Sequence, residues 1–235
     1  QAETVNARVL DEATTRASND SALAGRISTT EAKLTRTPDI FRIKASGNTA
    51  YASPFGQSTN IFRPDGSNIT INRSYGVITF EANSNVINFA ETFDVYGSQD
   101  EAARMAAVLN GIGTGQTVIV VTNDEPYTWR LARGLDTAMA RVGAGEKFFS
   151  PNFAVHSVYV LVGRGGLSRG EGVEYYQGNV NQDPNAFLDL NIPMLDGRPA
   201  IGSSGAASVV QAAVNYEIFV RATQDSALAG RIATT

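Results

Sequence analysis

Hydrophobic and polar residues follow a helical period at the start of this chain, and the period changes further on. Ala, Leu, Arg and Glu dominate the first segment, where apolar residues recur in a weak heptad that includes Leu23 and Ile27. Pro38 prevents a helix from continuing. The pattern therefore predicts a helix over residues 1–37, and we interpret its heptad as the seam of a coiled-coil stalk.

The two ends of the chain repeat each other. Residues 16–30 read RASNDSALAGRISTT and residues 221–235 read RATQDSALAGRIATT, so that twelve of fifteen positions are identical. The two copies lie too far apart for a solenoid, whose repeats span about 20–50 residues. We therefore predict a second helical stalk over residues 206–235 and expect a globular domain to be inserted between the two. A single helix with this seam is marginal in water, which favours association with copies of itself.

The middle of the chain changes to short strand-like runs, which predict a globular domain over residues 38–178. Runs that alternate apolar and polar residues, or that are rich in β-branched residues, predict strands at 40–45, 60–62, 68–72, 76–82, 86–96, 117–121, 157–162 and 173–177. Helical spacing predicts one helix after Ser98 and a second over residues 128–142. Residues 179–205, rich in Asn, Asp, Pro, Gly and Ser, are expected to form a connector to the second stalk.

The order of these elements predicts an α+β fold, a mixed β-sheet sandwich with two helices. Hairpin signals between the early strands favour antiparallel neighbours there. The later order of strand, helix, strand, helix, strand favours parallel neighbours. We therefore expect the strands at 117–121 and 157–162 to run parallel.

Composition narrows the function classes. The chain has 235 residues, of which 43% are hydrophobic and 18% are charged, and its net charge is −4. The basic residues are scattered, so we expect no nucleic-acid partner. No apolar run approaches the roughly 20 residues that span a membrane, so we expect no membrane-spanning segment. Because the chain begins at Gln1 rather than Met, we expect it to be a piece of a longer protein.

Residues for catalysis are sparse. The chain has no cysteine, and His156 is its only histidine, which excludes thiolate catalysis and metal sites rich in His. No G-x-S-x-G motif presents a serine nucleophile. We therefore expect no enzymatic activity, no cofactor and no metal.

Four polar residues near the ends of two predicted strands are candidates for ligand binding. Asp124 and Glu125 follow the strand at 117–121, whereas His156 precedes and Arg164 follows the strand at 157–162. Parallel strands would place Asp124 beside Arg164, and antiparallel strands would place it beside His156. The alternative is that Asp124 caps the next helix and that His156 is a surface residue without a role.

Five motifs in the middle of the chain, taken in order, resemble the interleukin-like EMT inducer family, also called the ILEI-like or GG domain. They are IFRIKASG at 40–47, GVITF at 76–80, FDVY at 93–96, TVIVV with its acidic turn at 117–125, and VYVLVGRGG at 158–166. The secreted animal members are disulfide-bonded, and this chain has no cysteine. The resemblance implies a sugar site, because the GG domain attached to a protein O-mannose N-acetylglucosaminyltransferase binds sugar through an acidic residue of this turn and nearby arginines. One such arginine is replaced here by His156.

The repeated flanks resemble the stalks of bacteriophage tail fibres and host-specificity tail-tip proteins, in which ILEI-like domains also occur. This resemblance implies a homotrimer in the tail of a virion, outside the cell. Its implied partners are other tail proteins and a glycan or protein receptor on the bacterial surface. The alternative function is a structural domain that decorates the fibre and binds nothing.

Overall fold

The computed structural model describes residues 2–34, 37–47, 58–178 and 186–200 of the chain. The chain divides into two units. One consists of Gln1–Thr37 together with Gly202–Thr235, and the other of Pro38–Ile201. The predicted stalk at 206–235 lies outside the described residues.

The first unit contains helix α1, Ala2–Leu34, which confirms the predicted N-terminal helix. Most of its described side chains are exposed, and Glu12 and Arg16 form an ion pair one turn apart at 3.6 Å. Ile27, an a position of the predicted heptad, is 47% exposed. Association with another helix would bury this exposed apolar side chain.

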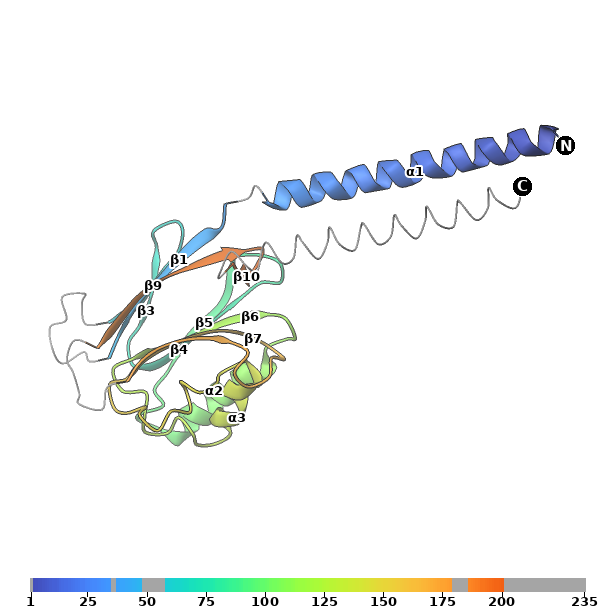
Figure 1. Cartoon of the computed structure of the whole chain (residues 1–235). Helices are drawn as coiled ribbons and strands as arrows, with labels where there is room; N and C mark the ends of the chain where they lie inside the picture. The colour runs from blue at the N-terminus through green and yellow to red at the C-terminus, as the bar shows by residue number, and fades with distance from the viewer. Residues whose placement is uncertain (1, 35–36, 48–57, 179–185, 201–235) are drawn as a thin grey trace. The chain divides into compact units, whose positions relative to one another are not determined.

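The second unit contains two five-stranded antiparallel sheets, which confirms an α+β fold with two β-sheets (Figure 1). The first sheet has the order β10-β9-β1-β2-β3. Its strands are β1 Asp39–Ser46, β2 Thr59–Phe62, β3 Asn68–Ile71, β9 Phe187–Leu195 and β10 Arg198–Pro199. The second sheet has the order β5-β4-β6-β7-β8. Its strands are β4 Ser74–Phe80, β5 Ile87–Phe93, β6 Thr117–Asn123, β7 Val158–Arg164 and β8 Val173–Gln177.

The second sheet lies between two apolar layers. Figure 1 shows the first sheet on one side of it and two helices, α2 Gln99–Gly111 and α3 Leu135–Arg141, on the other. Alternate residues of β6 enter different cores. Ile119 and Val121 pack toward the first sheet, whereas Val118 and Val120 pack toward the helices. A central strand of this kind is a continuous apolar run, as the sequence predicted for 117–121.

The expectation of parallel strands is wrong, because β6 and β7 are antiparallel. After β6, α3 carries the chain to the far edge of the sheet, where the carbonyl of Val142 accepts a hydrogen bond from the backbone N–H of Arg164. The irregular segment 143–157 then returns to the edge where β6 ended. The sequence showed the helix but gave no sign of this second crossing.

The second predicted helix is shorter than expected. It was predicted over residues 128–142, whereas α3 begins at Leu135. Arg133 and Gly134 have φ values of 55° and 77°, a left-handed backbone that a helix cannot contain. The first predicted helix is confirmed as α2, and its cap residue Ser98 accepts a hydrogen bond from the N–H of Asp100 at 3.1 Å.

The expected connector at 179–205 contains part of the first sheet. Strand β9 pairs with β1 along the whole length of β1, from Asp39 opposite Met194 to Ser46 opposite Phe187. On its exposed face, Arg42 donates two hydrogen bonds to the carboxylate of Asp189 at 2.6 and 2.8 Å, which lowers the pKa of Asp189. The globular unit therefore extends to Ile201 rather than ending near residue 178.

We predict that Val120→Asp unfolds or severely destabilises the globular unit. Val120 is fully buried, so the substitution places an unpaired carboxylate in an apolar core, at a cost of several kcal/mol against a total stability of about 5–15 kcal/mol. Val86→Asp is the matched control, because Val86 is 56% exposed. Thermal melting followed by circular dichroism checks both. A Val120→Asp variant that melts with the wild type would contradict the position of β6.

Candidate functional site

The structure brings Asp124 and His156 together at one end of the strands of the second sheet, where β6 ends and β7 begins. We call this end the Asp124 edge of the sheet. His156 Nδ1 lies 3.2 Å from the backbone oxygen of Asp124 and 3.5 Å from its carboxylate Oδ1. Each side chain is 18% exposed, so the pair is partly shielded but within reach of solvent. Of the two pairings that the sequence left open, the structure therefore contains Asp124 with His156.

Arg164 lies at the opposite edge of the same sheet. In the antiparallel register of β6 and β7, Arg164 is paired with Thr117 at the start of β6, whereas Asp124 follows its end. The structure therefore does not bring Arg164 to Asp124.

Glu125 has a structural position. It is 4% exposed, and its carboxylate accepts hydrogen bonds from the backbone N–H of Tyr127 at 3.0 Å and from the hydroxyl of Thr128 at 2.8 Å. The carboxylate thus caps the turn that leaves β6. This is not the helix cap that the sequence offered as the alternative role for Asp124, because the next helix, α3, begins only at Leu135.

The backbone at this edge is in an uncommon conformation. Asp124 and His156 have φ values of 60° and 64°, and Ser74, the first residue of β4, has a φ value of 57°. Non-glycine residues seldom occupy this left-handed region, and when they do they are often at functional sites. Ser74 pairs with Asn123, so all three residues are at the same end of the sheet.

Buried polar groups hold this turn in place. The backbone N–H of Asp124 donates to the carbonyl of Ser46 at 3.1 Å. The amide of Asn123 accepts from the N–H of Thr59 and donates to the carbonyl of Asn72, both at 2.9 Å. These bonds connect the two sheets at the site, because Ser46 and Thr59 belong to the first sheet and Asn123 to the second.

Gly47 allows the close approach of β1 to His156. A Cβ atom at this position would lie 2.2 Å from the backbone oxygen of His156, which no side chain permits. Close by, the buried hydroxyls of Ser46 and Ser74 have no hydrogen-bond partner within the part of the chain that the structure describes. Buried polar atoms are nearly always paired, so two unpaired hydroxyls next to the strained turn mark this edge as unusual.

Sequence reasoning missed a second polar group at this end of the sheet. Arg73, directly before β4, forms an ion pair with Asp94 at 3.3 Å and lies over the ring of Tyr96 at 4.6 Å. Tyr96 is 43% exposed. The sequence indicated this cluster only in part. The motif FDVY contains Asp94 and Tyr96, but nothing in the sequence showed that Arg73 lies against them.

Arg130 was also missed. It is 7% exposed, and its guanidinium lies over the rings of Tyr127 and Phe153 while one nitrogen donates to the carbonyl of Ser150 at 3.3 Å. Its Nε is buried and unpaired among the described residues. These contacts fix the segment after the turn against the chain that returns to β7.

The described residues contain no group of three or more His, Asp or Glu side chains that could hold a metal ion. Among the described helices, none is both long and apolar enough to cross a membrane.

Comparison with known families supports the resemblance seen in the sequence. Residues 73–167 match the family described as Interleukin-like EMT inducer. This part of the chain is therefore an ILEI-like domain, and it contains β4–β7 with both helices as well as Asp124 and His156. The motif at 40–47 and strand β9 lie outside the match. No curated protein matches the chain.

We predict a loss of stability above pH 10 that is due to two buried tyrosines. Burial raises the pKa of Tyr75, which donates to the carbonyl of Pro126, and also that of Tyr159, which donates to Glu174. Above about pH 10 the unfolded chain releases these protons and the folded chain keeps them. The free energy of unfolding therefore falls with rising pH by about 1.4 kcal/mol per unit for each tyrosine.

Urea unfolding between pH 9 and pH 11 measures this slope. Tyr75→Phe and Tyr159→Phe should each make it shallower, although each variant loses a hydrogen bond at neutral pH. An unchanged slope in both buried variants would refute the assignment.

Proposed function

We propose that the globular unit is a saccharide-binding domain carried by a phage tail fibre or tail-tip protein, with Asp124 and His156 in its binding site. The observation that carries the proposal is the meeting of these two side chains, each on a residue with left-handed backbone, at neighbouring strand ends that are partly open to solvent. A carboxylate accepts hydrogen bonds from sugar hydroxyls, and an imidazole N–H donates to them. The family resemblance, which implies sugar binding at this turn, supports the same site.

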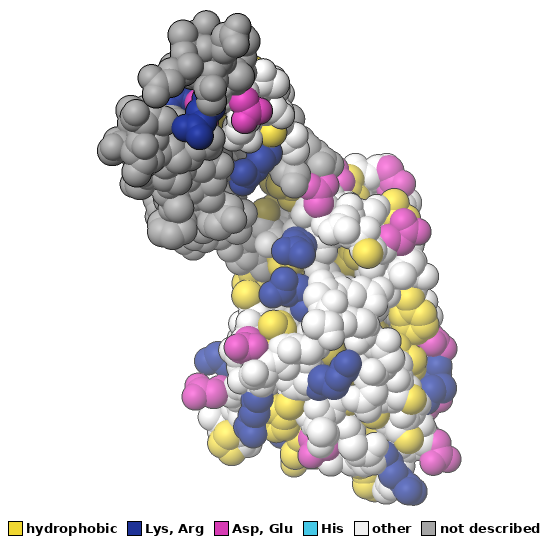
Figure 2. Space-filling model, turned by 90° about the vertical axis from the view of Figure 1, so that its right-hand side faces the viewer, with side chains coloured by type: hydrophobic (Ala, Val, Ile, Leu, Met, Phe, Trp, Pro, Cys, Tyr) yellow, Lys and Arg dark blue, Asp and Glu magenta, His cyan; other side chains and the backbone are white. Residues whose placement is uncertain are grey.

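The charge distribution is consistent with this ligand class. On the face of the globular unit shown in Figure 2, Lys and Arg side chains are interspersed with Asp and Glu side chains. A polyanion such as nucleic acid is bound by a continuous basic area. Saccharide hydroxyls need only local donors and acceptors.

The helical flanks would assemble several copies of the globular unit on one fibre. The repeated sequence around α1 and the exposure of Ile27 favour assembly of identical chains through these helices, and the resemblance to tail fibres points to a homotrimer. Three copies of a weak site on one fibre raise the overall avidity without any new contact. Contacts with a bacterial surface receptor and with other tail proteins follow from this placement.

A structural role in the fibre is the second candidate. Met194 of β9 pairs both with Asp39, where the chain begins β1, and with Pro199, where it leaves β10. Adjacent strands lie roughly 4.8 Å apart, so the two ends of the unit are close together. A domain with neighbouring ends can be inserted into a fibre as a spacer without binding anything.

We predict that Asp124→Asn and His156→Asn each weaken binding to bacterial surface polysaccharide at least about tenfold, or 1.4 kcal/mol. Asn tolerates the left-handed backbone, so both variants should keep the turn while removing the carboxylate or the imidazole. Binding of the full chain to an array of lipopolysaccharide and capsular polysaccharides measures the effect.

Arg164→Ala is the control, since it lies at the opposite edge of the sheet. Equal binding by both Asn variants and the wild type would show that Asp124 and His156 are not part of the binding site. If the wild type binds no polysaccharide, the spacer function is favoured.

We predict that the full chain sediments as a trimer. Ile27→Asp, which places a charge in the heptad seam, should shift the equilibrium toward monomer. Ser18→Asp is the control, because position 18 falls at a solvent-facing f position of the same heptad. A wild-type chain that sediments as a monomer at micromolar concentration would exclude assembly through these flanks.

A further inference from the structure

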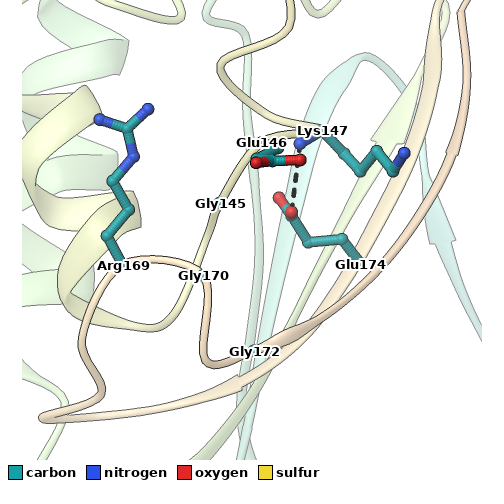
Figure 3. Close-up of a pocket in the computed structure, with 7 residues that line it drawn as sticks. All are labelled: Gly145, Glu146, Lys147, Arg169, Gly170, Gly172 and Glu174. Atoms are coloured by element: carbon teal, nitrogen blue, oxygen red, sulfur yellow. Dashed lines mark hydrogen bonds between the residues drawn. The ribbon is translucent and has the colours of Figure 1, made fainter.

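A hollow of about 630 Å³ lies between two glycine-rich loops, away from the Asp124 turn (Figure 3). One loop follows α3 and contributes Gly145–Lys147, and the other follows β7 and contributes Arg169 and Gly170. Glu174 of β8 lies between them. The second loop begins where β7 ends, which is the edge of the sheet opposite to Asp124 and His156. The hollow is therefore a separate feature.

The glycines of these loops allow the two backbones to touch. The N–H of Gly172 donates to the carbonyl of Gly143 at 2.9 Å, and the N–H of Gly170 donates to that of Ala144 at 3.0 Å. A Cβ atom on Gly145 would lie 2.6 Å from the Cα of Gly170. The loops are thus fixed by backbone contact, and the wall between them is made of peptide groups rather than apolar side chains.

Glu174 is held rigidly in the hollow. Its carboxylate accepts hydrogen bonds from the hydroxyl of Tyr159 at 2.8 Å, from the N–H of Phe148 at 3.1 Å and from the N–H of Lys147 at 3.2 Å. An ionised carboxylate offers about four acceptor positions. One position therefore remains for a ligand, on a group that needs no rearrangement to bind it.

The other charged side chains that line the hollow are Glu146, Lys147 and Arg169. In the view of Figure 3, Lys147 and Arg169 extend to opposite sides of Glu174. Glu146 and Lys147 are exposed, and neither side chain has a hydrogen bond or ion pair with the described residues. The guanidinium of Arg169 lies over the ring of Phe149 at 3.9 Å, which holds its orientation.

We propose that this hollow is a second saccharide subsite that takes a neutral sugar residue. The inference rests on the proposed function and adds a ligand class to it. Two cations and two carboxylates cancel, so an anionic ligand meets Glu146 and Glu174 and a cationic one meets Lys147 and Arg169. A hydroxyl group satisfies both kinds, because it donates to carboxylates and accepts from ammonium and guanidinium groups. The volume lies within the roughly 300–1,000 Å³ of small-molecule sites.

Amide chemical shifts of the isotope-labelled chain of residues 1–235 test the subsite. Glucose, galactose, mannose and N-acetylglucosamine are titrated separately at millimolar concentration. The expected result is a saturable shift of the Gly145, Gly170 and Gly172 amides with at least one of these sugars. Lys147→Ala keeps the backbone N–H that binds Glu174 and should weaken this binding several-fold. Arg198→Ala, on the first sheet, is the control and should have no effect.

Three results would overturn the inference. Saturable shifts at Asp124 and His156 alone would remove the subsite and leave the proposed function standing. The absence of saturable shifts anywhere would count against both. Tighter binding of glucuronic acid than of every neutral sugar at the glycine amides would show that the hollow selects an anion.

Discussion

The globular unit depends on the burial of β6 on both faces. Every residue of Thr117–Asn123 is buried, with alternate side chains in the core between the sheets and in the core beneath the helices. Such a strand leaves no room for ligand contacts along its length. Polar chemistry is therefore confined to its ends and to the loops that follow its neighbours. Both candidate sites obey this constraint, one at each edge of the second sheet.

The backbone is fixed by different means at the two ends of the second sheet. At the Asp124 edge the chain reverses through left-handed non-glycine residues, and their positions are fixed by the buried amide of Asn123 and by Gly47. At the opposite edge the glycine loops meet through their peptide groups, and a fixed carboxylate lies between them. In both cases the backbone that carries these side chains is fixed by hydrogen bonds, and some of them are made by the side chains themselves, as the carboxylate of Glu174 does with the N–H groups of Lys147 and Phe148.

The sequence predicted the elements better than their arrangement. Periodicity located the strands and α2, because burial on one or both faces leaves a local pattern. It could not show that β6 and β7 are antiparallel, since the return of residues 143–157 across the sheet has no periodic pattern. It also missed β9, although FLDLNIPML at 187–195 alternates apolar and polar residues, because Pro193 and the polar residues on both sides favoured a connector. The pairing of β9 with β1, which includes the contact of Arg42 with Asp189, is not visible in a local pattern. The motifs located Asp124 and His156, and only the register of β6 and β7 decided between His156 and Arg164.

The backbone at the Asp124 edge also limits which side chains can stand there. Asn, Asp and His are the residues best tolerated in the left-handed region, so the conformation alone explains much of the choice at positions 124 and 156. It does not explain the charge. Asn would suit the turn as well as Asp, and it would avoid the cost of partly burying a carboxylate. The turn itself is already capped by the carboxylate of Glu125. A carboxylate beside an imidazole, partly shielded yet open to solvent, offers both an acceptor and a donor for a hydroxyl group. The conformation therefore accounts for the residue types that can stand at these positions, and the proposed saccharide site would give the charge of Asp124 a role.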